Sequence, residues 1–274
     1  MKSLHIGKIF NGLGLILVVA IFALPFVWMI STSFKTLGET LTFPPQWIPE
    51  KFSVENFIVA WNSGPFFHYF KNSLIVSISI LILQFCTIIP AAYAFARYDF
   101  KGKKIFFGLT MMTLMIPAQL IFLPVYLQMS SWGLLDTLAA LILPFASSAF
   151  GIFMLRQSFM QVPEELLEAA RLDEASEWKI IFRLMIPMAK PVLITFALFS
   201  FISHWNDYFW PLVMTTSDAA RTLPLGISKL REVEGGIAWN ILMAGNMILV
   251  IPILIVFFFA QRQIIRAFVY TGVK

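Results

Sequence analysis

Apolar residues in this chain gather in long blocks, and most charged residues lie in the shorter stretches between them. Because a hydrocarbon core about 30 Å thick is crossed by roughly 20 apolar helical residues, blocks of that length are typical of transmembrane helices. The pattern predicts six spans, near Gly12–Ser31, Asn72–Ala96, Ile105–Leu127, Thr137–Leu155, Pro191–Val213 and Asn240–Gln261. We therefore expect an all-α, polytopic membrane protein with six transmembrane helices.

The central apolar stretch, Ile105–Leu155, contains only one charged residue, Asp136, and is too long for a single helix. The polar and glycine residues of 130–133 predict a turn that divides it into two spans. Prolines inside the spans predict kinks, at Pro90, Pro117, Pro124, Pro144 and Pro252.

The composition agrees with a membrane environment, since 59% of residues are hydrophobic and 13% are charged. Soluble domains carry roughly a quarter charged residues. The net charge of +5 comes from basic residues spread along the chain, which argues against a nucleic-acid partner. Cys86 is the only cysteine, so an intrachain disulfide is excluded.

The distribution of lysine and arginine predicts the orientation of the spans. Six spans place both termini on one side, and the loops of that side hold 14 of the 20 basic residues. Because cytoplasmic loops are enriched in lysine and arginine, we expect both termini in the cytoplasm.

Three segments are expected along the chain. Residues 1–71 form the first helix and an external loop, in which Pro44, Pro45 and Pro49 favour extended or turn structure over a packed domain. Residues 72–262 form the core, with a charged cytoplasmic loop at 161–190, and residues 263–274 form a cytoplasmic tail.

The charged loop contains a predicted amphipathic helix. Pro163 precedes Glu164 and Glu165, and carboxylates in a first turn suit the helix dipole. Leu166, Leu167 and Ala170 recur at helical spacing, and a second helical run is expected over Glu177–Met185. Such a helix can dock in a partner's groove, although a solvated linker between two spans fits the same pattern.

The residues from Glu168 to Ala175, EAARLDEA, followed by Ile186-Pro187, resemble the EAA loop of binding-protein-dependent ABC importer permeases. The resemblance implies a type I ABC importer transmembrane domain in a bacterial or archaeal cell membrane. In this family, the coupling helix docks on an ATP-binding subunit. Glu174 replaces the glycine of the family pattern, which leaves the geometry of the turn open. The residues implied in coupling are Glu164, Glu168, Ala169, Ala170, Arg171, Asp173 and Glu174.

A second stretch, Trp205–Leu212 (WNDYFWPL), resembles an element of carbohydrate-importer permeases of the maltose and glycerol-phosphate type, and the chain is similar to the smaller permease of such a pair. The implied partners are a sister permease, two copies of an ATP-binding subunit and an external solute-binding protein. The implied solute is a sugar or oligosaccharide, with glycerol 3-phosphate or its diesters as the alternative. This chain would bind no cofactor and no metal, because ATP and Mg²⁺ are used by the partner ATPase.

A small polar solute needs hydrogen-bonding groups along its path through the bilayer. Ser200, Ser203, Asn206 and Asp207 are expected on one helical face, so that a neighbouring ring could stack on a sugar. The candidate path residues are Gln84, Gln119, Ser203, Trp205, Asn206, Asp207 and Tyr208. Bonds between helices and interfacial anchoring explain the same residue types.

The external loop of residues 214–239 contains Glu234, Gly235 and Gly236. By resemblance, this loop enters the cleft of the binding protein, and a plain connector fits equally well.

Other functional classes fit less well. A secondary transporter usually carries carboxylates near mid-membrane and an inverted repeat, and neither is visible. The three histidines are scattered, and no HExxH, GxSxG or paired-carboxylate pattern occurs, so an enzyme is not expected. The chain also lacks a GxxxxGK[ST] motif, so ATP would be handled by another chain. A receptor or purely structural membrane protein would not need the predicted docking loop.

Overall fold

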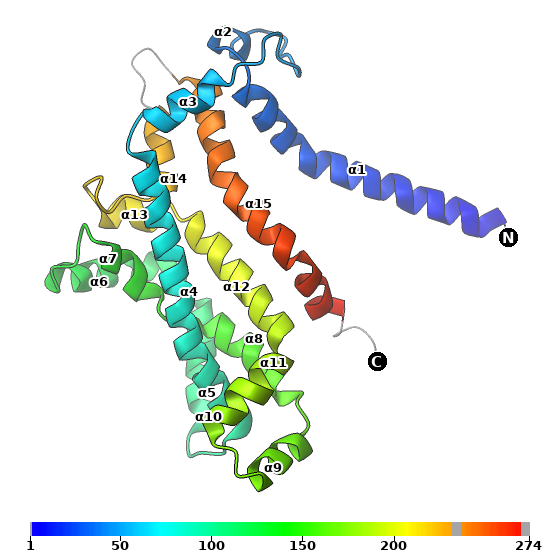
Figure 1. Cartoon of the computed structure of the whole chain (residues 1–274), viewed down its shortest axis with the longest axis vertical. Coiled ribbons are helices and arrows are strands. Elements are labelled where there is room, and N and C mark those ends of the chain that lie inside the picture. Colours follow the sequence, from blue (N-terminus) through cyan, green and yellow to red (C-terminus); the bar gives the residue numbers. More distant parts are fainter. Residues whose placement is uncertain (1, 232–236, 270–274) are drawn as a thin grey trace. The chain divides into compact units, whose positions relative to one another are not determined.

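The computed structural model describes residues 2–231 and 237–269, with side chains from 12–231 and 237–262, and all regular elements within these ranges are helical. The helices are α1 (Lys2–Ser33), α2 (Leu37–Thr40), α3 (Glu55–Asn62), α4 (Phe66–Arg97), α5 (Lys103–Met112), α6 (Ala118–Ser131), α7 (Leu138–Ile142), α8 (Ala149–Met160), α9 (Glu164–Leu172), α10 (Glu177–Ile180), α11 (Ile186–Met188), α12 (Lys190–Trp205), α13 (Phe209–Met214), α14 (Leu223–Ser228) and α15 (Trp239–Val269) (Figure 1). Short 3-10 segments are η1 (Thr113–Met115), η2 (Leu143–Phe145) and η4 (Lys229–Arg231), and η3 (Ile181–Met185) is a π-helix.

Three helices are long and apolar enough to cross a membrane without interruption, over Gly12–Ser33, Phe66–Arg97 and Trp239–Arg262. Three bent pairs also qualify, and they raise the number of spans to six if each pair counts as one. The polytopic all-α class predicted from the sequence is therefore confirmed. The second span begins earlier than predicted, because α4 starts at Phe66.

Three of the six predicted spans, the third, fourth and fifth, are not continuous helices. The pair that contains α5 and α6 bends by 101°, and the pair that contains α7 and α8 bends by 42°. The first break falls at Ile116 and Pro117, where Ile116 is extended (φ −88°, ψ 116°). A proline disfavours helical geometry in the residue before it, so Pro117 breaks this span instead of kinking it. By contrast, α4 and α15 continue through Pro90 and Pro252.

The fifth predicted span is broken at both ends. The helical segments of Glu177–Met188 meet α12 at an angle of 80°. The second helical run was expected to end before Pro187, but it continues through this residue to Met188. At the other end α12 stops at Trp205, and α13 begins only at Phe209. The helix predicted over Pro191–Val213 is therefore wrong beyond Trp205.

The chain forms two compact units, residues 1–67 with 225–252 and residues 68–224 with 253–274. In the first unit, the loop after α1 is held by buried polar contacts. The Nδ2 of Asn56 donates to the carbonyl oxygens of Ser33 and Lys35, both at 2.8 Å, and Asn240 donates to Asn56 Oδ1 at 2.8 Å. Within the predicted external loop, residues 55–62 form a helix, α3, which the prolines at 44–49 did not predict.

The second unit has two apolar clusters that position its helices. One joins α4, α8, α12 and the segment 159–189, and includes Ile88, Phe159, Leu167 and Phe196. The other joins α4 to α6, α7 and α13. Gly151 allows close packing in the first cluster, since a Cβ there would lie 2.7 Å from the Phe196 ring and 3.0 Å from Ile88. The division of the chain into segments 1–71, 72–262 and 263–274 stays a prediction.

Candidate functional site

The helix predicted in the charged loop is α9, and it lies at the end of the second unit where α4 finishes (Figure 1). Glu164 and Glu165 occupy its first turn and Arg171 its last, so the charges complement the helix dipole. Leu167 is fully buried in the apolar cluster shared with α4 and α8. This contact holds α9 from one side and leaves Glu168, Ala169 and Leu172 exposed.

The turn after α9 is a Schellman motif. The N–H of Ala175 donates to the carbonyl of Ala170, and the N–H of Glu174 donates to that of Arg171, both at 3.0 Å. Glu174 has φ +54°, the left-handed conformation that this motif requires and that glycine adopts most easily. The turn therefore keeps the geometry of a glycine turn although glutamate occupies the position.

A network of charged groups ties α9 to the end of α4. Arg97 donates to Glu164 Oε2 at 2.8 Å, and Arg171 donates to Glu164 Oε1 at 3.3 Å. Arg171 Nε also donates to Glu177 Oε1 at 3.3 Å, and the hydroxyl of Tyr93 donates to Glu177 Oε2 at 2.5 Å. Arg97 further donates to the carbonyl oxygens of Phe159 and Val162. The network links both ends of α9 and the start of α10 to one membrane helix.

Sequence reasoning had assigned Glu164 and Arg171 to the coupling loop but had missed Tyr93, Arg97 and Glu177 as their partners. The available signal was the position of Arg97 at the end of a long apolar span. Glu168 behaves differently from Glu164: among the residues that the structure describes, it forms no ion pair. Its side chain is exposed and is available to another chain.

Two candidate path residues, Gln84 and Ser203, line one cavity of the second unit. The cavity has a volume of about 230 Å³ and is lined by polar groups and phenylalanine rings, including Gln84, Ser148, Ser200, Ser203 and His204. Gln84 is engaged within the chain, since its Nε2 donates to Phe145 O at 3.1 Å and its Oε1 accepts from Ser200 Oγ at 2.6 Å. Ser203 is exposed at the lining.

The other path candidates are not brought together. Trp205 is fully buried, in edge contact with Phe70 at 5.5 Å between ring centres, so no sugar face can stack on its ring in this conformation. Asn206 and Asp207 follow the end of α12, which contradicts the helical face predicted to join them to Ser203.

The remaining polar candidates lie at helix ends or surfaces. Asp207 Oδ1 accepts from the N–H of Trp210 at 3.3 Å at the start of α13. Tyr208 and Gln119 are exposed, and neither lines the cavity of Gln84 and Ser203. The predicted loop residues Glu234, Gly235 and Gly236 lie outside the described residues.

Asp136 joins two loops of the second unit. Its Oδ1 accepts from the N–H groups of Thr216 at 2.8 Å and Ser217 at 2.9 Å. The backbone N–H of Ser217 first, together with that of Thr216, lowers the pKa of this carboxyl group to about 2. The carboxylate is therefore the form that holds these loops together at neutral pH.

Comparison with known proteins connects these features to a family. Residues 88–270 match the model of the family described as "Binding-protein-dependent transport system inner membrane component". The arabinooligosaccharides transport system permease protein AraQ of Halalkalibacterium halodurans is 35% identical over 270 residues, 96% of this chain and 94% of that protein. The diacetylchitobiose uptake system permease protein NgcG of Streptomyces coelicolor is 33% identical over 91% of this chain and 83% of its own.

A further relative and a solved structure extend the similarity. The sn-glycerol-3-phosphate transport system permease protein UgpE of Escherichia coli is 31% identical, over 95% of both chains. A crystal structure of a bacterial ABC transporter involved in the import of the acidic polysaccharide alginate shares the fold, with a TM-score of 0.84 and 24% identity over 96% of this chain and 98% of that chain. The chain belongs to the multi-pass inner-membrane permeases of binding-protein-dependent ABC transporters, a family of non-catalytic transport subunits.

Proposed function

We propose that this chain is one of two permease subunits of an ATP-driven importer and forms half of the path for a sugar or oligosaccharide. The observation that carries the proposal is the similarity, over more than nine-tenths of the chain, to permeases whose names specify arabinooligosaccharides and diacetylchitobiose. The relative named for sn-glycerol 3-phosphate supports the alternative solute. The external binding protein delivers the solute, the sister permease completes the path, and two ATP-binding subunits drive it.

The solute class is tested by uptake in cells that express the whole transport system. Labelled arabinotriose, diacetylchitobiose and glycerol 3-phosphate are the three probes, and deletion of this chain is the control. Uptake of either saccharide that depends on the chain supports the proposal. Uptake of glycerol 3-phosphate alone would replace it with the alternative.

Within this importer, α9 is the helix that docks on an ATP-binding subunit. Three structural features support the assignment: Leu167 anchors the helix in its own chain, Arg97 and Arg171 hold its first turn through Glu164, and Glu168 stays exposed. The small exposed Ala169 permits close approach of a partner backbone. Asp173 and Glu174 form the turn that ends α9.

Charge reversal at Glu168 tests this role. Loss of one partner from a charge pair at an interface costs about 2–5 kcal/mol, so Glu168→Lys should weaken docking at least tenfold. We expect membrane insertion to persist while ATP hydrolysis no longer drives uptake. Glu165→Lys is the matched control, because Glu165 is an exposed glutamate in the first turn of the same helix. Wild-type uptake by the Glu168 variant in membrane vesicles would remove the role.

The cavity of Gln84 and Ser203 is the part of the solute path contributed by the second unit. Its serine hydroxyls, the amide of Gln84 and the adjacent phenylalanine rings are the groups that bind sugars, through hydrogen bonds and apolar stacking. Four residues outside this cavity remain candidates for the solute path: Gln119, Asn206, Asp207 and Tyr208. They would belong to it only if assembly with the sister permease placed them along the same path. Trp205 instead packs inside the chain, against the rings of Phe70 and Phe201.

Substitutions that preserve packing test the path. Ser203→Ala removes a hydroxyl from the exposed lining and should change the uptake rate or solute preference, whereas Ser228→Ala, far along the chain in α14, should not. Equal transport of every probe by both variants would argue against the cavity.

Both termini lie in the cytoplasm in the proposed orientation, because the loops on that side carry most of the basic residues. The single native cysteine makes the test simple. In a Cys86→Ser background, a cysteine at Ser3 should react with a membrane-impermeant maleimide only after the cells are opened. Labelling of intact cells would show that the orientation is the reverse of the proposed one.

The segment 234–236 is proposed to contact the binding protein, and a plain connector remains the alternative.

A further inference from the structure

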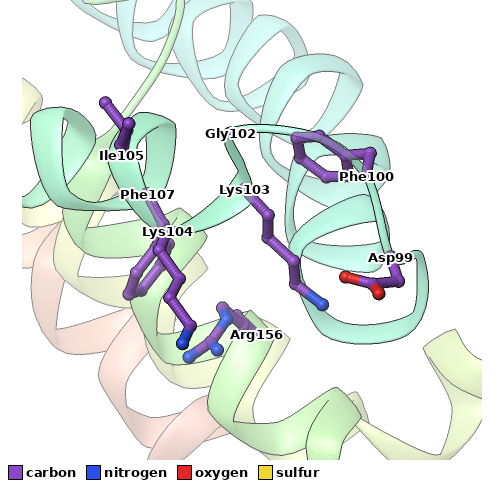
Figure 2. A pocket seen from close by; sticks show the side chains of 8 residues that line it. All are labelled: Asp99, Phe100, Gly102, Lys103, Lys104, Ile105, Phe107 and Arg156. Carbon is purple, nitrogen blue, oxygen red and sulfur yellow. The ribbon is translucent and has the colours of Figure 1, made fainter.

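A pocket of about 650 Å³ lies where α4 ends and α5 begins, with one wall from α8 (Figure 2). It belongs entirely to the second unit and is separate from the contacts of α9 described above. Its charged lining residues are Asp99, Lys103, Lys104 and Arg156, and the rings of Phe100 and Phe107 complete the wall. The pocket adjoins the end of a transmembrane helix and is therefore placed at the membrane–water interface.

Two cations converge in this pocket. Figure 2 shows the nitrogen ends of Lys104, from α5, and Arg156, from α8, pointing toward each other. Arg156 is fixed in this orientation, because its Nε donates to Phe95 O at 3.1 Å and its guanidinium carbon lies 4.2 Å from the centre of the Phe107 ring. Like charges that face each other repel, so this arrangement favours an anion between them.

The described part of the chain does not supply that anion. Within the residues that the structure describes, neither Lys104 nor Arg156 forms an ion pair with a carboxylate. In Figure 2, Asp99 lies beyond Lys103 from these two cations, and the amine of Lys103 donates to Tyr98 O at 2.7 Å. Three cations against one carboxylate leave an excess of two positive charges in the lining.

The helix dipole of α5 adds to this positive charge. Its first turn contains Lys103 and Lys104 and no acidic residue, although the positive end of the helix dipole disfavours cations there. Beyond this turn, the outer surface of α5 is apolar, with Ile105, Phe106 and Leu109 exposed. Cations beside an exposed apolar helix surface match a ligand with an anionic head and hydrocarbon chains.

We propose that this pocket binds the phosphate group of an anionic phospholipid. Lys104 and Arg156 contact the phosphate oxygens, since lysine and arginine both bind phosphate through charge-assisted hydrogen bonds. The acyl chains then lie along Ile105 and Leu109 of α5. The bound lipid neutralises the repulsion between the two cations and thereby joins the start of α5 to α8. In the proposed orientation, it belongs to the cytoplasmic leaflet.

The test uses the assembled transporter in nanodiscs of phosphatidylcholine with a minor fraction of phosphatidylglycerol. After detergent extraction, native mass spectrometry measures the phosphatidylglycerol that remains bound. Lys104→Gln and the double variant Lys104→Gln/Arg156→Gln should retain it about tenfold less well or worse, since each removes a charge-assisted phosphate contact. Lys101→Gln is the matched control, because Lys101 is an exposed lysine of the same loop that does not line the pocket.

The single variant keeps the test valid if the double variant fails to assemble, because the exposed Lys104 has no packing role in its own chain. Retention by the wild type and Lys101→Gln, together with loss in Lys104→Gln, supports the lipid site. Equal retention by Lys104→Gln overturns it, as does an equal loss in the control, which would indicate general attraction to basic loops. Displacement of the lipid by inorganic phosphate would identify soluble phosphate as the ligand and overturn the lipid source. None of these readouts depends on which solute is transported.

Discussion

The clamp formed by Arg97 leads to a quantitative prediction. Its side chain is 9% exposed and donates to Glu164 Oε2 and to two backbone carbonyl oxygens. The pair with Glu164, which is 50% exposed, is worth at most about 1 kcal/mol, as for surface ion pairs. If an apolar residue replaces Arg97, the carbonyl oxygens of Phe159 and Val162 also lose a charged donor. Each of these hydrogen bonds, counted separately, is worth roughly 1.5–3 kcal/mol.

These values are not additive, and the buried Nε of Arg97 has no hydrogen-bond partner among the described residues, which reduces the net value. We expect Arg97→Met, which keeps the apolar stem, to destabilise the docking of α9 by about 2 kcal/mol. An energy of this size corresponds to a roughly 30-fold larger equilibrium population of the opened helix.

Hydrogen–deuterium exchange in the assembled transporter measures that opening. The amides of α9 should exchange roughly 30-fold faster in Arg97→Met, whereas those in the middle of α4 should not change. Arg183→Gln is the matched control, since Arg183 is an exposed arginine of the same loop. Glu164→Gln should have a smaller effect than Arg97→Met, because it leaves both carbonyl bonds in place. Exchange in α9 of Arg97→Met at the wild-type rate would refute the clamp.

Three further predictions concern single positions. Glu174→Gly should stabilise the transporter against heat by about 1 kcal/mol, because φ +54° strains a residue that has a Cβ. The control Asp173→Gly, at φ −80°, should destabilise it. No gain in stability for Glu174→Gly would contradict the strained turn. The folded-state pKa of Asp136, about 2, lies below the usual value near 3.9, so its stabilisation of the loops is present above pH 4 and is lost as the pH falls toward 2. Amide exchange at Thr216 should rise in that window. Asp136→Asn should abolish this pH dependence. Gly151→Ala should lower the unfolding free energy by about 1–3 kcal/mol, because the added methyl overlaps the Phe196 ring. The control Gly108→Ala has open space around the added methyl and should be tolerated. Equal stability of the two variants would show that the helices separate easily.

Much of the membrane topology follows from local patterns. Apolar block length predicted the polytopic all-α class, and the turn expected at 130–133 is present, since α6 ends at Ser131 and Gly133 has φ +68°. Breaks inside the blocks were not predicted, because periodicity reports apolar character and not whether a helix continues. At Pro117 the preceding residue turns extended, whereas α15 passes through Pro252 without interruption. The same residue type thus has two outcomes, and the surrounding packing selects between them.

The candidate sites divide in the same way. The amphipathic pattern of residues 164–172 is local, so α9 was predicted almost to the residue. The partners of Glu164 were not, because Arg97 lies 67 residues earlier in the chain. The helical face proposed for Ser203 and Asn206 was wrong because α12 ends between them, at Trp205.

By itself, the sequence determined that this protein crosses the membrane several times and carries an amphipathic helix in a charged loop, because hydrophobic burial and helix propensity act over short stretches of chain. Only the tertiary structure decided that Glu174 takes a left-handed conformation, that Arg97 secures α9, and that Lys104 and Arg156 line one pocket. Each of these depends on groups that folding brings together from distant positions. Their energies arise from hydrogen bonds and charges in the folded state, which local sequence preferences do not encode.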